Sequence, residues 1–593
     1  MAKDNLQTDQ QPIWRSIAAR KQAIRSSLIP KDWTLSPEIL QSSQQTALQP
    51  SSPWRTSGIL TQWELHLTDS HDATSLLGLL TTGALKSEDV VRAFCKRAAI
   101  AQQLTNCLTE IMFDAALVRA QELDAHLTRT GRPIGPLHGL PISMKDTFKL
   151  VGVDSSVGIA GLCFKPADTN SALVDLLLEL GAVIHVKTNV PQTMMALDSH
   201  NNVFGRTLNP ANNALTAGGS SGGEGALIAM KGSPLGVGTD VGGSIRVPAA
   251  CNGLYGIKPS IGFVPYAGQE EGSKPGAKKL ALEPVAGPIA GSLRDCEMLM
   301  RTIANANPTR FDPDVLIGTW NKMESLPRRN LTIGIIHTDG HVNPLPIINK
   351  LMHQISTTLS QNHHHQIEII HLDVSSILTR ALKTFNGIIS IDGANTWLDH
   401  LDTTSEPLSP WLQNRLTRRN PKSLEQVREL QAQKMDLQAE FLRVWQEKGG
   451  YWLPDTNLSN RGMKEEGNRI LDAIIMPLAP HPILPIDRWN TVNYTAALNL
   501  LDLPSGVLPV RKVSKSDLEA KIDTGSKPLN GWDEVNREHW TDVNRSVYEG
   551  STLSVQVIAP RLRERRLVEV MGVVAEVLEP LGREDGGRGG SKL

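Results

Sequence analysis

The sequence has few cysteines, and their spacing offers neither a metal site nor a disulfide framework. There are five, odd in number and scattered, and no two form a CxxC pair: Cys95, Cys107, Cys163, Cys251 and Cys296. This pattern argues against a zinc site and a disulfide scaffold and favours a reducing compartment. We interpret Cys163 and Cys251 as packing residues.

An excess of charge is also missing, because 60 basic residues stand against 61 acidic ones. The chain therefore has no electrostatic reason to bind nucleic acid or an anionic membrane. No uninterrupted apolar run approaches the ~20 residues that span a bilayer, and the polar start MAKDNLQTDQQ does not resemble a signal peptide. We expect a soluble, intracellular protein with no membrane span and no nucleic-acid partner.

What the sequence does contain is an alternation of helical and buried-strand patterns. The segment SALVDLLLELGAVIHVKTN predicts a helix closed by Gly181 and then a strand, and LTIGIIH and DAIIMPL predict further strands. Such alternation indicates an α/β fold with a covered sheet. We expect one large domain at about 66–578, because strand patterns continue from about 135 to 558. A polar, helical N-terminal wrap at 1–65 precedes it and a disordered tail at 579–593 follows it.

Two helix starts and one insertion can also be predicted. Ser87 is expected to cap the helix that follows it, and Ser423 with Gln426 forms the capping box of a long amphipathic helix. The charged stretch 511–550 has no clear period. It suits either a surface insertion or a lid over a site.

Two glycine-flanked serine loops lie close together in the chain: GGSSGGEGAL at 218–227 and GVGTDVGGSIRVP at 236–248. Neither fits a nucleotide site, because the first lacks the GK[ST] ending of a P-loop and the second has Val241 where a GxGxxG motif needs its third glycine. The first loop formally matches the G-x-S-x-G elbow of α/β-hydrolases, with Ser221 as nucleophile. That elbow should follow a strand, yet the loop-like NPANNALTAGG precedes it, and no downstream histidine stands out.

A run of three histidines, His363 to His365, raises a metal hypothesis. Adjacent histidines cannot all face one ion, and no carboxylate or further histidine lies at ligand spacing. We interpret the run as a solvated turn and expect no metal.

The remaining chemistry is serine-based acyl transfer without histidine, which needs a nucleophile, a base and oxyanion donors. Ser244 follows consecutive glycines, so the backbone amides of Val241, Gly242, Gly243 and Ser244 can converge on one point as an anion nest. Burial can lower the pKa of a lysine until it serves as a base. Lys145, in the mostly apolar run HGLPISMKDTF, is the best-placed candidate.

At these blocks the sequence resembles the amidase signature family. GLPISMKD, GGSSGGEGALI and GVGTDVGGSIRVPAACNGLYGIKPS are similar to its three signature blocks, within a core at about 135–262. Further segments, among them VKTNVPQTMM, NNVFGRTLNP and SVQVIAPRLRE, resemble fungal acetamidases and general amidases. The likeness covers roughly residues 55 to 575.

The resemblance implies a role for each matching position. Lys145 matches the catalytic lysine, Ser220 the relay serine that follows a cis peptide bond, and Ser244 the acyl-forming nucleophile. Met194 matches a position whose backbone carbonyl lines the acyl pocket, although its side chain suits a core methionine equally. The family fold is a large, twisted, mixed sheet surrounded by helices.

The implied reaction is hydrolysis of a small or aryl carboxamide through an acyl-enzyme, without a cofactor. Asp240 and Arg246 flank the nucleophile, and we expect them to form a buried ion pair that holds its loop. Three alternatives stay open: a glutaminase-like subunit of a transamidation complex, a serine esterase, and an inactive scaffold. The sequence neither requires nor excludes a homodimer.

The last three residues, Ser591-Lys592-Leu593, match a receptor-read peroxisomal address. The glycine-rich GREDGGRGG before them supplies a flexible spacer that leaves the tripeptide accessible. We therefore expect import by the peroxisomal receptor, with the cytoplasm as the alternative. A fluorescent protein fused to the N-terminus should give punctate signal that coincides with a peroxisomal marker, and deletion of Leu593 should make it diffuse. Diffuse signal from the intact tail would show that the tripeptide is accidental.

Overall fold

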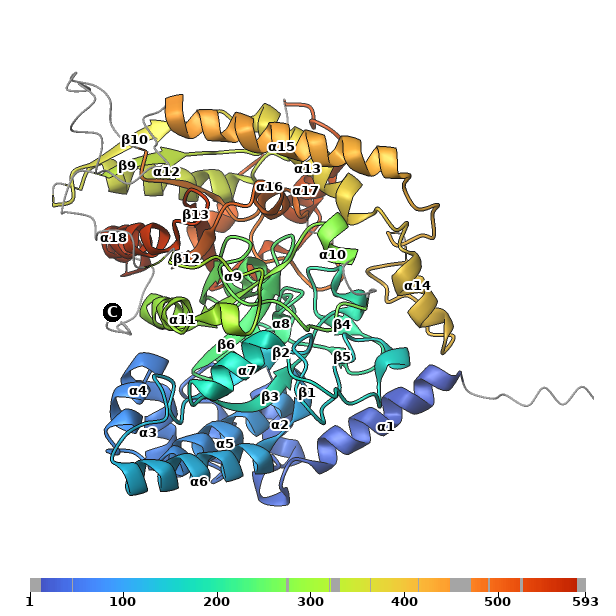
Figure 1. Cartoon of the computed structure of the whole chain (residues 1–593). Coiled ribbons are helices and arrows are strands. Elements are labelled where there is room, and N and C mark those ends of the chain that lie inside the picture. Colours follow the sequence, from blue (N-terminus) through green and yellow to red (C-terminus); the bar gives the residue numbers. More distant parts are fainter. Residues whose placement is uncertain are drawn as a thin grey trace, which may run out of the picture.

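The computed structural model describes residues 12–44, 46–272, 277–318, 320, 331–362, 364–413, 415–447, 471–488, 491–522 and 526–583. One mixed sheet of 11 strands runs through this part of the chain, in the order β1-β3-β2-β6-β8-β7-β12-β13-β11-β9-β10 (Figure 1). Its strands are β1 (Leu108–Ile111), β2 (Pro141–Lys145), β3 (Val183–Thr188), β6 (Leu235–Asp240), β7 (Tyr255–Lys258), β8 (Val285–Ala290), β9 (Leu331–Ile335), β10 (Ile367–His371), β11 (Ala473–Pro477), β12 (Ser505–Lys512) and β13 (Thr552–Ile558). The predicted α/β fold with a covered sheet is confirmed.

Helices from both halves of the chain cover the sheet. They are α3 (Gln62–Ser70), α4 (Ala73–Thr81), α5 (Ser87–Thr105), α6 (Phe113–Thr130), α7 (Ala172–Glu179), α8 (Gly222–Ala229), α9 (Arg246–Cys251), α11 (Leu293–Asn305), α12 (Pro346–Ser360), α13 (Ser375–Ile389), α16 (Asn493–Leu500) and α18 (Glu564–Arg583). A second shell comprises α10 (Ala277–Leu280), α14 (Asn395–Asp402), α15 (Leu424–Glu447) and α17 (Gly531–Thr541), and β4 (His200–Asn201) pairs with β5 (Gly205–Arg206) beside the main sheet. Helix α15 lies along the top of the view in Figure 1.

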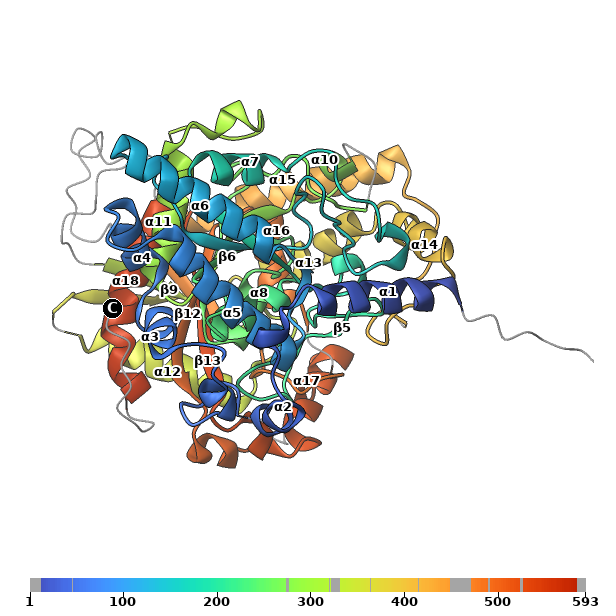
Figure 2. The same ribbon diagram turned by 90° about the horizontal axis from the view of Figure 1, so that it is seen from below.

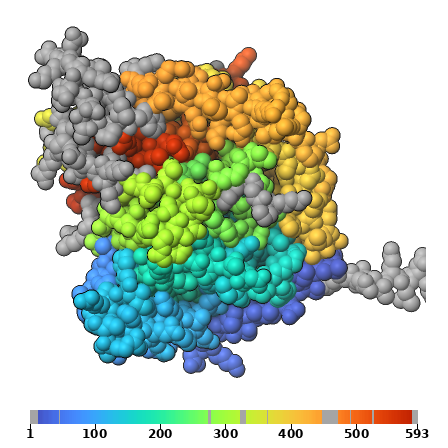
Figure 3. Space-filling model, in the orientation of Figure 1, coloured from blue at the N-terminus to red at the C-terminus, as the bar shows by residue number. Residues whose placement is uncertain are grey.

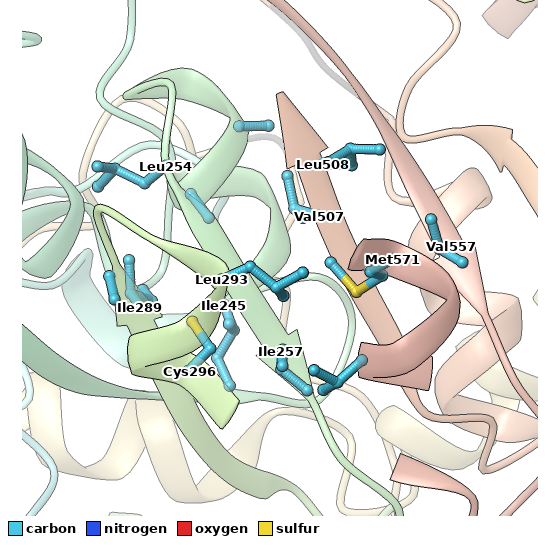
Figure 4. Packing of buried hydrophobic residues seen from close by; sticks show 14 of the residues in the cluster. Ile245, Leu254, Ile257, Ile289, Leu293, Cys296, Val507, Leu508, Val557 and Met571 are labelled. Atoms are coloured by element: carbon cyan, nitrogen blue, oxygen red, sulfur yellow. The ribbon is translucent and has the colours of Figure 1, made fainter. Parts of the chain in front are cut away.

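The core shows that the chain forms a single domain. One continuous apolar cluster joins residues from Leu67 to Leu581. Figure 4 shows its centre, where Ile257 of β7 and Val507 of β12 meet Leu293 and Cys296 of α11 and Met571 of α18. Because these residues come from opposite ends of the sequence, neither half can complete the core alone.

The N-terminal segment packs against this domain as a wrap. Helix α1 (Ile13–Ser27) is followed by α2 (Pro37–Ser43), and both lie below the sheet in Figure 1 and near α5 in Figure 2. In Figure 3 the blue N-terminal residues lie directly against the teal residues of the domain. Lys21 of α1 contacts Glu110 at 2.5 Å and Asp154 at 2.8 Å, so buried ion pairs fix the wrap.

The glycines of strand β6 allow helix α8 to pack closely against the sheet. Its side chains alternate, so Leu235 and Val237 enter the apolar core while Gly236 and Gly238 face α8. A Cβ atom at Gly236 would lie 2.0 Å from Glu224 Oε2, and one at Gly238 would lie 2.8 Å from Ser221 Oγ. Only glycine lets α8 approach this closely.

Local predictions had mixed outcomes. The helix-to-strand unit closed by Gly181 is present as α7 and β3, and Ser423 and Gln426 form their capping box. The prediction that Ser87 caps its helix is wrong, because α5 begins at Ser87 without a side-chain cap. The carboxylate of Asp124 on α6 accepts hydrogen bonds from the Ser87 and Glu88 amides instead.

Two further segments can be placed in part. The stretch 511–550 contains α17, which docks on the 338–350 region through hydrogen bonds such as that from the Asn343 amide to Asp533 at 2.8 Å. Residues 579–583, assigned to the tail from the sequence, belong to α18, whose Leu578 and Leu581 are buried. The rest of the tail, including Ser591-Lys592-Leu593, lies outside the described residues.

Candidate active site

Lys145 is the last residue of β2 and is buried, with 1% of its surface exposed. Its Nζ atom lies 2.7 Å from Ser220 Oγ and 2.7 Å from Thr239 Oγ1. Burial lowers the pKa of Lys145 to about 7, although the charges of Asp240, Glu224 and Asp146 oppose this shift. A large fraction of the lysine is therefore a neutral amine near neutral pH.

The two serine loops lie side by side at the end of this lysine. Ser220 precedes α8 and follows a cis Gly219–Ser220 peptide bond, and Ser244 lies between β6 and α9. The amide of Ser221 donates to the carbonyl of Ser244 at 3.2 Å, which joins the loops directly. Both Ser220 and Ser244 are buried, with 2% and 5% of their surfaces exposed.

The nucleophile-elbow alternative does not fit this geometry. The chain before Ser221 is a loop, as its sequence predicts, and no strand leads directly into the turn among the described residues 207–221. Ser221 is fully buried, and its Oγ accepts a 3.4 Å hydrogen bond from the Thr239 amide. Its hydroxyl is used in packing the two loops together.

Asp240 and Arg246 form the expected ion pair, and both side chains are fully buried. Arg246 Nε donates to Asp240 Oδ2 at 3.0 Å and Nη2 donates to Oδ1 at 3.1 Å. Burial alone would raise the pKa of Asp240, but Arg246 holds it well below its usual range. The same guanidinium donates to Gln556 Oε1 and Asn499 Oδ1, so β13 and α16 take part in the network.

The nest of four amides predicted to bind the oxyanion needs one correction. The Gly243 amide already donates to Asp240 Oδ1 at 2.7 Å, because the aspartate side chain reaches forward over the turn that begins with it. The amides of Val241, Gly242 and Ser244 take part in no hydrogen bond among the described residues. These three remain the candidates.

Met194 lies on a segment that passes beside the serine loops. A Cβ atom at Gly219 would lie 2.7 Å from the carbonyl oxygen of Ala196, so the two backbones are in contact. The side chain of Met194 is half-buried and packs against the cluster of Val157, Ile159 and Leu401. Its neighbour Gln192 is fixed by a 2.6 Å hydrogen bond to the buried carboxylate of Glu406.

On another side the loop that carries Ser244 meets apolar residues of α13. Phe385 lies 3.2 Å from where a Cβ atom of Gly242 would be, and Val241 packs against the same cluster. Apolar side chains therefore surround the loop as well as hydrogen-bond partners. Sequence reasoning missed Phe385, because nothing in its helix marks it as a neighbour of Gly242, which lies 143 positions earlier.

Sequence reasoning also missed Glu224, although it stands inside the first serine loop motif. Its carboxyl group is fully buried and accepts hydrogen bonds from Ser143 Oγ at 2.6 Å and Thr188 Oγ1 at 2.8 Å. Burial raises the pKa of Glu224 to about 8. The residue ties α8 to β2 and β3, the strands that carry Lys145 and its neighbours.

Other features of the structure concern the cysteines, metal binding and membrane-spanning helices. The five cysteines are free and buried. Within the described part of the chain, which omits His363, no group of three or more His, Cys, Asp or Glu side chains could hold a metal ion. His364 and His365 lie in a turn whose amides donate to Asn362. None of the helices in the described ranges is long and apolar enough to cross a membrane.

Comparison with known proteins gives the family. The model of the family described as Amidase matches residues 89–568. The chain belongs to the amidase family. It is 34% identical to an acetamidase of Aspergillus oryzae, over 95% of this chain and 99% of that one, and 32% identical to a putative amidase of Schizosaccharomyces pombe, again over 95% of this chain and 99% of the relative.

Solved structures agree with this assignment. A fatty acid amide hydrolase superimposes with a TM-score of 0.82 at 27% identity, covering 95% of both chains. A bacterial aryl acylamidase of the amidase signature family shares the fold, with a TM-score of 0.63 over 86% of this chain and 96% of that one. The resemblance to amidase signature enzymes is confirmed, and the protein is a hydrolase of amide carbon–nitrogen bonds.

The buried network predicts a large effect of removing one charge. Arg246→Ala leaves the Asp240 carboxylate buried without its partner, which costs about 3–5 kcal/mol in comparable cases. We expect a marked fall in the midpoint of thermal denaturation. Arg310→Ala is the control, because Arg310 pairs with Glu179 at the surface and should leave the midpoint nearly unchanged. Equal midpoints for the two variants would contradict the structural role of the Asp240–Arg246 pair.

Proposed function

We propose that the protein hydrolyses a carboxylic acid amide through an acyl-enzyme on Ser244, with Ser220 as proton relay and Lys145 as base. The observation that carries this proposal is the 2.7 Å contact between Lys145 Nζ and Ser220 Oγ in a buried site beside Ser244. The products are the carboxylate and ammonia or an amine.

The proposed steps follow from these positions. Ser244 Oγ attacks the amide carbonyl while its proton passes to Ser220 and the Ser220 proton passes to neutral Lys145. The negative oxygen that develops on the carbonyl carbon is stabilised by the amides of Val241, Gly242 and Ser244. The proton returns through Ser220 to the leaving nitrogen, because an amide anion is a very poor leaving group. Water then hydrolyses the acyl group from Ser244.

The nature of the substrate is part of the proposal. Relatives named acetamidase favour a small carboxamide, and the apolar surroundings formed by Val241 and Phe385 favour an uncharged acyl group. Met194 is proposed to border the acyl side through its backbone carbonyl. Ammonia release by the purified protein without partner chains would distinguish this function from a transamidation subunit, and parallel ester substrates would test the esterase alternative.

Labelling with a fluorophosphonate tests the assignment of the two serines. We expect Ser244→Ala to abolish both turnover and covalent labelling while the fold stays intact. Ser220→Ala should slow acylation by orders of magnitude yet keep some labelling, because the relay is lost and the nucleophile remains. Label found on Ser221 in the Ser244→Ala variant, or wild-type rates for Ser220→Ala, would overturn these roles.

The pH dependence of kcat/KM tests the base. Only the neutral amine accepts a proton, and the pKa of Lys145 is about 7, so activity should fall roughly tenfold per pH unit below neutrality. Lys145→Ala should lose most activity and also lose this acid limb. A Lys145→Ala variant that keeps the wild-type rate and the same limb would refute the role.

A further inference from the structure

The peptide group between Gly242 and Gly243 is held at both of its ends. Its carbonyl oxygen accepts a 2.5 Å hydrogen bond from Thr495 Oγ1, and its N–H donates to Asp240 Oδ1 at 2.7 Å. Because a peptide group is planar, fixing both ends fixes its orientation.

The carbonyl groups of the next two residues, Gly243 and Ser244, also accept hydrogen bonds. The Gly243 carbonyl accepts from the Val247 amide at 2.7 Å, and the Ser244 carbonyl accepts from the Ser221 amide at 3.2 Å. The amides of Gly242 and Ser244 lie on either side of the fixed peptide and have no partner among the described residues. Together with the Val241 amide, they are the backbone donors that the hydrogen bonds of this loop leave without a partner in the described structure.

Thr495 is placed for this contact by the same network that holds the nucleophile loop. It lies on α16 with 2% of its surface exposed, and its own carbonyl accepts from Arg246 Nη2 at 3.1 Å. One turn later on the same face, Asn499 Nδ2 donates to Asp240 Oδ1 at 2.9 Å. Helix α16 therefore contacts the loop through two side chains, Thr495 and Asn499.

The close approach also explains why residue 243 is glycine. Gly243 has φ +130°, and a Cβ atom there would lie 2.6 Å from Thr495 Oγ1. Any side chain would push the helix away from the loop and break the bond to the Gly242 carbonyl.

We propose that Thr495 is a positioning residue of the oxyanion hole, which keeps the amides of Gly242 and Ser244 aimed at the reacting carbonyl by holding the peptide between Gly242 and Gly243. This inference rests on the proposed function, because it assumes that Ser244 is the nucleophile. Thr495 acts through the backbone and does not touch the substrate.

Thr495→Val tests the proposal, because valine keeps the branched shape and removes the donor. We expect kcat to fall by about 10–100-fold, less than the loss of a direct oxyanion donor, while KM changes by less than about threefold. Affinity for a boronic acid, which forms a tetrahedral adduct on the serine, should fall by a similar factor. Affinity for the carboxylate product should stay. Thr495→Ser should restore kcat and boronate affinity.

Thr105→Val is the matched control. Thr105 is also a buried helical threonine that donates to a backbone carbonyl, that of Ala101 at 2.7 Å, but it lies on α5. It should leave kcat and boronate affinity unchanged. Wild-type kcat for Thr495→Val, or equal losses of boronate and product affinity, would overturn the positioning role. Activity or boronate binding by Ser244→Ala would instead overturn the proposed function, so the two failures are distinguishable.

Discussion

The carboxylate of Asp240 is the group on which the geometry of the loop that carries Ser244 depends. It stands at the end of β6 and accepts hydrogen bonds from the amides of Gly243 and Ile245 and from the side chains of Arg246 and Asn499. A buried carboxylate is stable only with such partners. The requirement to satisfy its charge therefore shapes the turn that carries Ser244 and draws α16 and β13 against it.

A second constraint is the burial of Lys145, which lowers the pKa of this lysine and ties the site to the sheet. Strands β2 and β6 are parallel neighbours, so their carboxyl ends meet at one edge, where Lys145 ends one strand and Asp240 ends the other. Both side chains are buried at this edge. The low dielectric that lowers the pKa of Lys145 would also strengthen the electrostatic action of the backbone amides on an oxyanion.

The sequence predicts the fold class, three of the strands and the candidate residues because these depend on short-range patterns. Lys145, Ser220, Ser244 and Asp240 stand in motifs of about ten residues, and β3, β9 and β11 show as apolar runs. Contacts across hundreds of residues leave no such pattern. Asp124 replaces the expected cap at Ser87, and Thr495 reaches Gly242 across 253 positions. The assignment of Gly243 to the oxyanion nest failed for a related reason, since a motif does not show which amide an adjacent carboxylate already occupies.

The candidate catalytic residues come from one local part of the chain, whereas the surfaces around them come from distant segments. Lys145, Ser220 and Ser244 all lie within residues 145–244, and the close packing around them needs the glycines that these motifs contain. The surfaces around them come from elsewhere, because Phe385 lies on α13 and the segment of Met194 is braced by Glu406 through Gln192. Under the proposed function we expect the choice of amide to depend on α13 and on the 192–198 and 403–409 segments, because these lie outside the hydrogen bonds that satisfy Asp240.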